Sequence, residues 1–330
     1  MLRAAIAGLG WWGQNLVNAT NGSEAIRFTA ANTRNGNTAA AFCQDKGLRW
    51  TADFDDILRD PAIDAVVLAT PHSLHADQVK RAAAAGKHVF VEKPFALNTE
   101  DAHAMVNAAE KTGITLAVGF NRRFHPSMLR MRNAVKSGAL GTIVTINAEQ
   151  TALHGLALTQ EAWRAQPAES PGGAMTAIGV HLVDGMIDLL GRVREVNAIV
   201  TRRAATLADD TTSVQLRFES GVLGQVFCST AATPHYRFAT YGTDGFAEIL
   251  GHPMATYRLI PATTDHRRPA DPVVTETPGF NMLTAELEAF AVSIASGQPF
   301  PTPLSDILHG VAVFEAILRS AEQGRPVSIG

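Results

Sequence analysis

The stretch LRAAIAGLGWWG, residues 2–13, decides how the first part of the chain folds. Residues 2–8 form a short and continuously apolar run, which is typical of a strand buried on both faces of a parallel sheet. Gly8, Gly10 and Gly13 follow with the spacing GxGxxG, and the pattern of residues 12–19 predicts a helix. A strand, a glycine turn and a helix in this order predict the first βα unit of a doubly wound sheet.

Similar elements alternate as far as residue 120. The expected strands cover residues 63–70, 87–92 and 114–120, and the expected helices cover residues 37–46, 73–85 and 98–112. Each of these helices is followed by a glycine, the residue that best accepts the left-handed conformation after a helix end. The alternation predicts a doubly wound parallel sheet in an α/β domain.

The pattern changes after Phe120. A helix is expected over residues 127–136, followed by strands in which apolar and polar residues alternate, at 142–150, 194–203, 211–221 and 222–231. The last two of these strands form a predicted hairpin. Strict alternation is typical of a sheet with one covered face, so we expect a second, α+β domain with a mixed or antiparallel sheet.

The last part of the chain combines loops and helices. Residues 251–280 lack a period, and we expect surface loops with short edge strands there, or a lid. Two amphipathic helices close the chain, and their apolar stripes contain Leu283, Leu287, Phe290 and Ile294 in the first and Ile307, Val311, Phe314 and Leu318 in the second.

Composition excludes several classes of partner. The 330 residues include 28 basic and 31 acidic side chains, for a net charge of −3, which gives no reason to expect nucleic acid or an anionic membrane. Cys43 and Cys228 lie far apart, so neither a disulfide framework nor a zinc site is indicated. Without a signal pattern or a long apolar run, the chain is expected to be cytoplasmic and soluble, with a small molecule as its partner.

The glycine turn is a candidate dinucleotide site. Glycines let the backbone approach a pyrophosphate, which binds the unpaired N–H groups at the N-terminus of the following helix. Leu9, Trp11 and Trp12 complete this turn and are included in the predicted cofactor site. For the two tryptophans, packing across the helix start is the alternative to a place near the nicotinamide.

The residues twenty positions beyond Gly13 favour NADP. An acidic residue there would bind the ribose 2′-hydroxyl of NAD, but this chain has Thr33 and Arg34. A hydroxyl and a guanidinium can instead bind a 2′-phosphate, whereas a carboxylate would repel it. We expect NADP as the cofactor, with NAD as the alternative.

The string Glu92-Lys93-Pro94 follows a predicted parallel strand, at the end of the sheet where ligands bind. Proline restricts Lys93 to an extended backbone. Burial and a nearby oxidised nicotinamide would both lower the pKa of Lys93, and a lysine with a lowered pKa can transfer a proton near neutral pH. The alternative is an ordinary surface lysine.

With these motifs the chain resembles the Gfo/Idh/MocA family of glucose-fructose oxidoreductases and inositol dehydrogenases. The similar segments are GLGWWG, ATPHSLH (69–75), HVFVEKPFAL (88–97), VGFNRRFHP (118–126), GALGTI (138–143), AWR (162–164) and the GG and GVHLVD pieces of 172–184. The resemblance implies NAD(P)-dependent hydride transfer on sugars, inositols or related cyclic alcohols. It also implies a Rossmann domain at residues 1–121 and a domain at 122–330 whose large open sheet binds substrate and forms homodimers or homotetramers.

The resemblance also assigns roles to individual residues. Lys93 corresponds to the lysine that handles the proton of the reacting hydroxyl. Six further positions are implied to line the cofactor together with Glu92, namely Thr70, Pro71, His75, Asn121, Trp163 and Arg164. Arg122 or Arg123 is implied to lie near the cofactor or the substrate. His72 and His75 have the spacing of a metal pair, but no third ligand is evident and we expect no metal.

His181 keeps the position of the family's catalytic histidine. The family usually has an aspartate four residues earlier, where this chain has Ala177. Asp184 follows His181 at i+3 and is expected to orient it. The alternative for His181 is a core histidine bonded to a backbone carbonyl. We take Lys93, Arg122, Ala177 and His181 as the substrate site, with Lys93 and His181 as catalytic residues.

The resulting expectation is an NADP-preferring oxidoreductase acting on a secondary alcohol or ketone of a cyclic substrate, with sugars and inositols first. Because Ala177 replaces a carboxylate, two alternatives stay open. One is a dehydrogenase of an aromatic dihydrodiol, and the other is a nicotinamide-binding sensor without catalysis.

Overall fold

The computed structural model describes residues 1–34, 36–265, 268 and 270–330. Its backbone divides into two compact units. The first contains residues 1–121 and 281–308, and the second contains residues 122–280 and 309–330. The division at residue 121 coincides with the predicted boundary, but residues 281–308, which the sequence analysis placed in the second domain, group with the first unit.

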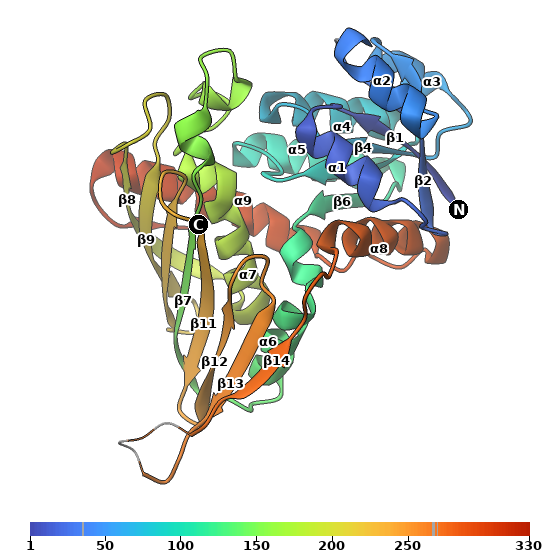
Figure 1. The fold of residues 1–330 in the computed structure, drawn as a ribbon. Helices are drawn as coiled ribbons and strands as arrows, with labels where there is room; N and C mark the ends of the chain where they lie inside the picture. The colour runs from blue at the N-terminus through green and yellow to red at the C-terminus, as the bar shows by residue number, and fades with distance from the viewer. Residues whose placement is uncertain (35, 266–267, 269) are drawn as a thin grey trace. The chain divides into compact units, whose positions relative to one another are not determined.

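The first unit is built on a parallel sheet of six strands in the order β3-β2-β1-β4-β5-β6 (Figure 1). The strands are β1 (Leu2–Ala7), β2 (Ile26–Asn32), β3 (Arg49–Thr51), β4 (Ala65–Leu68), β5 (His88–Glu92) and β6 (Leu116–Gly119). Strands β1, β4 and β5 are apolar because both of their faces are buried. The predicted doubly wound sheet is confirmed.

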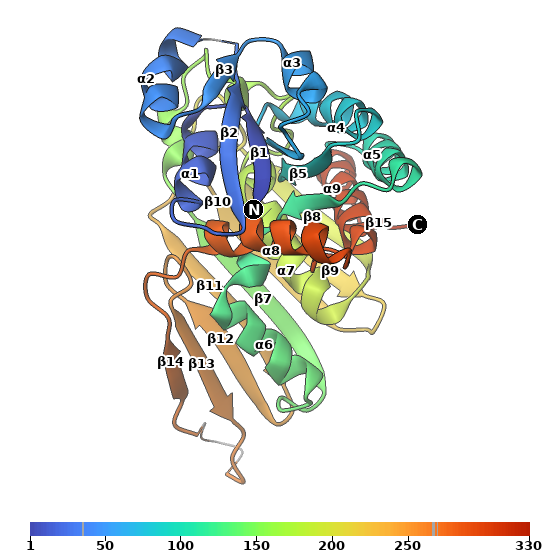
Figure 2. The same cartoon turned by 90° about the vertical axis from the view of Figure 1, so that its right-hand side faces the viewer.

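Six helices accompany this sheet: α1 (Trp11–Ala19), α2 (Gly36–Lys46), α3 (Phe54–Arg59), α4 (His75–Ala84), α5 (Thr99–Thr112) and α8 (Met282–Ser296). Helix α4 packs against α5, and α8 packs against α1 and β2 (Figure 2). The ring of Phe90 on β5 lies 5.7 Å from that of Phe290 on α8 and 6.5 Å from that of Phe300. The returning segment therefore completes the hydrophobic core of the first unit.

The second unit contains a mixed sheet of nine strands in the order β14-β13-β12-β11-β7-β10-β9-β8-β15. The strands are β7 (Ile143–Thr151), β8 (Val193–Thr201), β9 (Thr211–Phe218), β10 (Leu223–Ser229), β11 (His235–Gly242), β12 (Gly245–Leu250), β13 (Thr256–Pro261), β14 (Val273–Glu276) and β15 (Val327–Ser328). The predicted hairpin is β9–β10, whose strands pair antiparallel, and β10 pairs parallel to β7. The segment 251–280 contains the edge strands β13 and β14.

One face of the larger sheet is covered by helices. Helices α6 (Pro126–Lys136) and α7 (Val180–Leu190) pack against each other on the same side of the sheet (Figure 1). Helix α9 (Leu304–Gln323) contributes His309, whose Nε2 accepts the N–H of Val193 at 2.8 Å, and Ser320, whose Oγ accepts the N–H of Ala198 at 3.0 Å. Among the helices of the described residues, none combines the length and apolar character that crossing a membrane requires.

Candidate functional site

The glycine turn between β1 and α1 has the geometry of a phosphate site. Gly8 has φ +91°, and a Cβ there would lie 2.5 Å from the carbonyl oxygen of Ala69. A Cβ on Gly13 would lie 2.0 Å from the carbonyl oxygen of Gly8, so this glycine lets α1 pack closely on the turn. A Cβ on Gly10 would meet no atom within 4 Å, and no side chain caps the N-terminus of α1. The first N–H groups of α1 can therefore receive an anion, and the turn fits a dinucleotide.

The other residues of the turn divide between the core and the surface. Leu9 is buried, so only its backbone can meet a ligand. Trp11 is 75% exposed and its ring lies 5.5 Å from that of Trp12. The indole Nε1 of Trp12 is buried and has no hydrogen-bond partner among the described residues. The structure thus leaves one exposed ring and one unused donor beside the candidate phosphate site.

Thr33 and Arg34 directly follow β2, next to the end of β3. The N–H of Thr33 donates to the carbonyl of Thr51 at 3.3 Å, and the carbonyl of Thr33 accepts Trp50 Nε1 at 3.2 Å. Arg34 is exposed. The strand itself ends in Asn32, whose amide donates to the carbonyl of Thr51 at 3.2 Å. No carboxylate stands at the end of β2 in the described part of this loop.

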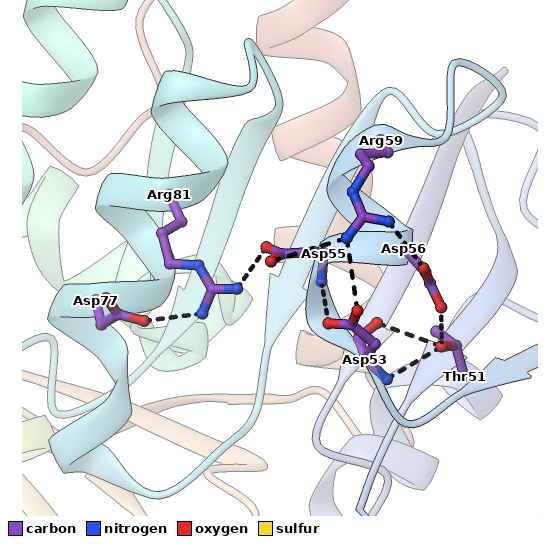
Figure 3. Close-up of polar contacts among 7 residues, drawn as sticks. All are labelled: Thr51, Asp53, Asp55, Asp56, Arg59, Asp77 and Arg81. Carbon is purple, nitrogen blue, oxygen red and sulfur yellow. Dashed lines mark hydrogen bonds and ion pairs between the residues drawn. The ribbon is translucent and has the colours of Figure 1, made fainter.

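The acidic residues that follow β3 are engaged elsewhere (Figure 3). Asp53 caps α3 by accepting the N–H of Asp55, and Asp56 accepts the hydroxyl of Thr51 at 2.7 Å. Arg81 on α4 bonds Asp55 at 2.5 Å, and it also bonds Asp77 on its own helix at 3.1 Å. This network braces the turn that carries Thr51, and Thr51 in turn holds Thr33.

The segment after β4 links the glycine turn to Lys93. Thr70 is buried and donates its hydroxyl to Gln78 at 2.6 Å. His75 is fully buried, with Nδ1 3.1 Å from the carbonyl oxygen of Pro94 and Nε2 3.3 Å from that of Thr70. His75 thus connects the loops after β4 and β5. Pro71 precedes His72, whose ring lies 5.7 Å from that of His75.

Lys93 follows β5 and is half-buried, and the Lys93–Pro94 peptide bond is cis. The preceding Glu92 is buried, and its Oε2 accepts the N–H of Lys93 at 3.3 Å. Since β1, β4 and β5 are neighbours, the glycine turn and Lys93 lie two strands apart, about 10 Å. The predicted cofactor residues of the first unit therefore gather at one edge of its sheet. Asn121, buried after β6, lies at the same edge.

The second unit begins with two arginines in different environments. The guanidinium of Arg122 lies over the ring of Tyr236, 5.3 Å from its centroid, and also bonds the Gln150 side chain. Burial lowers the pKa of Arg122 and raises that of Tyr236 to about 12. Gln150 and Tyr236 are neutral, and Arg122 Nη1 is buried without a hydrogen-bond partner in the described residues. This nitrogen can therefore donate a hydrogen bond to a ligand.

Arg123 belongs to a buried ion network. Its guanidinium donates to both carboxylate oxygens of Asp184 at 2.7 to 3.1 Å and to Asp188 at 3.2 Å. Arg132 donates to the second oxygen of Asp188 at 2.6 Å. The sequence predicted Asp184 as the acid that orients His181. The structure gives it a bidentate partner that spacing alone did not suggest.

Ala177 and His181 lie at the start of α7. Residues Met175–Gly179 form a π-helical turn, a feature frequent at functional sites. Gly179 is required in this turn, since a Cβ there would lie 2.5 Å from Met175 Sδ and 3.0 Å from Cys228 Sγ. Ala177 is half-buried and His181 is 8% exposed on the first turn of α7. The two predicted substrate residues thus lie on consecutive helical elements, Ala177 in the π-helical turn and His181 in α7.

Trp163 and Arg164 lie in a separate 3₁₀ turn, Trp163–Ala165. The guanidinium of Arg164 stacks 4.1 Å from the centroid of the Trp163 ring. Their predicted contact with the cofactor stays a prediction. Within the described ranges, no three His, Cys, Asp or Glu side chains come together as a metal site.

Two family models match the chain. Residues 2–120 match an oxidoreductase family with an NAD-binding Rossmann fold, and residues 128–248 match the GFO/IDH/MocA C-terminal domain. Together they cover well over half of the sequence.

Known relatives match nearly the whole chain. It is 32% identical over 302 residues to D-xylose 1-dehydrogenase (NADP(+)) 2 of Haloferax volcanii, covering 88% of each chain. It is 28% identical over 354 residues to inositol 2-dehydrogenase of Rhizobium meliloti, covering 99% of each. The structure of levoglucosan dehydrogenase in complex with NADH and L-sorbose superposes with a TM-score of 0.91 over 100% of this chain and 99% of that one, at 23% identity. That likeness shows a shared fold.

Proposed function

Since the chain belongs to the GFO/IDH/MocA oxidoreductase family, we propose that it is an NADP-preferring oxidoreductase acting on a cyclic polyol. Hydride would move between the nicotinamide and a secondary alcohol or ketone of a sugar, an inositol or a related ring. The observation that carries the proposal is the gathering of the glycine turn, the Thr70 loop and Lys93 at one sheet edge, with His75 bonded to both loops.

Lys93 and His181 are proposed as the proton-transfer residues. When bound, the nicotinamide accepts or supplies the hydride. Lys93 Nζ takes the hydroxyl proton during oxidation, or returns it during reduction. His181 bonds the same hydroxyl or its neighbour, and Arg122 offers its unused Nη1 to a further substrate oxygen. Glu92, Asn121, Trp163 and Arg164 are proposed to contact the cofactor.

The NADP preference rests on Arg34 and on Asn32 in place of a carboxylate. An exposed guanidinium after β2 can pair with a 2′-phosphate, and the carboxylates after β3 are already bonded to Arg59 and Arg81. Relatives named for NADP and a structural neighbour with NADH both occur, so the preference is tested directly on this chain.

A fluorescence titration with NADPH and NADH tests the cofactor proposal without a guess about substrate. We expect tighter NADPH binding in the wild type, and Arg34→Ala should weaken NADPH binding about tenfold or more, with NADH changed less than about twofold. Arg27→Ala is the matched control, because Arg27 is an exposed arginine on β2, the strand that precedes Arg34. Equal effects on both cofactors would contradict the role of Arg34.

Turnover with NADP⁺ on a polyol panel tests catalysis. Lys93→Met should lower kcat by about 10² to 10⁴ while NADPH still binds. Ala177 brings no carboxylate to the π-helical turn, which favours two alternative functions, a dehydrogenase of aromatic dihydrodiols and a sensor without catalysis. Turnover of aromatic dihydrodiols alone would favour the dihydrodiol dehydrogenase. Ligand binding without any turnover, unaltered in Lys93→Met, would favour a sensor.

We also propose a homo-oligomer formed through the uncovered face of the larger sheet. Phe227 is 40% exposed and Ile199 is 66% exposed, and both stand opposite Ser213 in the strand register, so they share a face. Leu223, on the same face of β10, is 54% exposed. The molecular mass in solution tests this, since Phe227→Asp should dissociate a dimer or tetramer that Val292→Asp on α8 leaves intact.

A further inference from the structure

Glu286 is a carboxyl group buried beneath α8 in the first unit. It is 0% exposed and shares the buried face of α8 with Leu287 and Phe290. Neither of its oxygens accepts a hydrogen bond from an N–H or O–H donor among the described residues. An ionised carboxylate without partners is strongly unfavourable in such surroundings, so this carboxyl requires another form of compensation.

Helix α8 contacts β5 near Glu92. The ring of Phe290, one turn after Glu286, lies against Phe90, which is two residues before Glu92. Glu92 lies close enough to Glu286 for its charge to act on the Glu286 carboxyl. A Cβ on Gly119 would lie 2.9 Å from Glu92 Oε1, so glycine on β6 leaves room for this carboxylate.

The neighbouring elements offer few other charges. Helix α1 carries no titratable side chain, β2 carries only the exposed Arg27, and β6 carries none. On β5, His88 lies at the opposite end from Glu92, and on α8 itself Glu288 accepts the hydroxyl of Ser23 at 2.7 Å. Burial raises the pKa of Glu286 well above its usual range, and repulsion from Glu92 raises it further.

We propose that Glu286 is held as the neutral carboxylic acid at neutral pH and that its O–H donates a hydrogen bond to the carboxylate of Glu92. Glu92 is thereby fixed in the rotamer that accepts the N–H of Lys93, and Glu286 acts as a positioning residue for the lysine two steps away. The positioning role rests on the proposed function of Lys93, whereas the neutral state of Glu286 does not.

The pH dependence of stability tests the neutral state. A carboxyl whose folded pKa is raised makes the native protein lose stability as pH rises from its unfolded pKa toward its folded pKa, because the native state binds more protons there. Glu286→Gln is neutral at every pH. Relative to the wild type, its unfolding equilibrium constant should therefore fall by up to about tenfold for each pH unit above the unfolded pKa of a glutamate, about 4.3, until the pH reaches the folded pKa.

Glu288→Gln on the same helix is the matched control and should show no such growth with pH. A Glu286→Gln variant that becomes less stable than the wild type as pH rises would show an ionised Glu286 and overturn the proposal. Infrared difference spectra give an independent readout, because the carbonyl stretch of a protonated carboxyl should be present in the wild type at neutral pH and absent in Glu286→Gln. Identical spectra would also overturn it.

Turnover separates positioning from simple packing. Glu286→Gln keeps a donor toward Glu92 and should retain kcat within about twofold, whereas Glu286→Leu should lose about tenfold or more with NADPH affinity unchanged. Equal kcat in both variants would remove the positioning role. If no substrate is turned over even by the wild type, the proposed function fails, while the stability and infrared results still decide the protonation of Glu286.

Discussion

The two units bury carboxyl groups against their sheets and compensate them in different ways. Asp184 beneath the helices of the second unit is 6% exposed, and Arg123 engages both of its oxygens. Glu286 on α8 is 0% exposed, and the neighbouring helix α1 and strands β2 and β6 carry a single cation, the exposed Arg27. The first carboxylate is compensated by a guanidinium and the second by its own proton. The partner, and not burial alone, therefore sets the ionisation of a buried acid.

A third carboxyl shows another solution. Asp210 is fully buried in the second unit and accepts the N–H groups of Arg203, Ala204 and Ala205 at 2.6 to 2.9 Å. Burial would raise its pKa, but these backbone donors outweigh burial and lower the pKa below its ordinary value. Backbone N–H groups and the hydroxyl of Thr211, which donates at 2.8 Å, thus keep this interior carboxylate charged, and no cation of the described residues is bonded to it.

The largest expected effect comes from removing the guanidinium of the ion network. Arg123→Met leaves Asp184 charged and buried, which should reduce the free energy of unfolding by about 3 to 5 kcal/mol. Urea denaturation measures it, with Arg192→Ala as control, since Arg192 and Glu219 form an exposed pair. A loss below about 1 kcal/mol would mean that Asp184 takes up a proton as Glu286 does, and the contrast between the units would disappear.

Asp210→Asn should have the next largest effect and a pH dependence opposite to that of Glu286→Gln. The variant places an amide among backbone donors, and its free energy of unfolding should be about 2 kcal/mol lower than that of the wild type at neutral pH. Because the pKa of Asp210 is lower in the folded than in the unfolded state, its charge stabilises the wild type above the unfolded pKa. The difference between variant and wild type should therefore shrink as acid protonates Asp210. Thermal unfolding from neutral to acidic pH measures it. A cost that stays constant in acid would show that the charge of Asp210 is irrelevant.

The smallest effect is expected at the exposed network of Figure 3. Arg81 and Asp55 are 40% and 44% exposed, and water already screens their charges. Arg81→Ala should lower the thermal midpoint by about 1 °C, a difference that should vanish in high salt. A large decrease that persists in high salt would instead show that the contact of the Arg81 guanidinium with the ring of Phe54 matters, 5.2 Å from the ring centroid.

The strands that the sequence predicted have a regular environment. β4 and β6 are buried throughout, β1 and β5 are buried except for the half-buried Arg3 and His88, and β9 and β10 alternate between buried and exposed residues. β2 has exposed Arg27 and half-buried Thr29 between apolar residues, and β11 and β12 carry Arg237 and Glu248, which bond each other at 2.9 Å. The sequence analysis missed these strands because their polar residues interrupt the apolar pattern. The hydrogen bond between Arg237 and Glu248 joins two strands, and a short stretch of sequence does not show such a partner.

Site residues divide in the same way. The glycine turn and Lys93 were predictable, because a short stretch of sequence shows both the glycines that a close approach of the backbone to a ligand requires and the residue that follows a strand. The predicted stripe of α8 contained Leu283, Leu287, Phe290 and Ile294, of which Leu287 and Phe290 are buried and the other two are half-buried. Glu286 is buried beside Leu287 and Phe290, and the apolar stripe did not predict it. From sequence alone, an acidic residue on a helix is interpreted as a surface residue unless the element that packs against it is known. That element was not known for α8, because the sequence analysis assigned α8 to the other domain.

The return of residues 281–308 to the first unit has a consequence for biosynthesis. Phe90 is fully buried partly because Phe290 and Phe300 cover it, and both are made two hundred residues later. A growing chain on the ribosome cannot close this core when its first 121 residues emerge. We expect nascent chains that lack α8 to expose an aromatic surface to chaperones, and nucleotide binding to mature only after α8 has been synthesised.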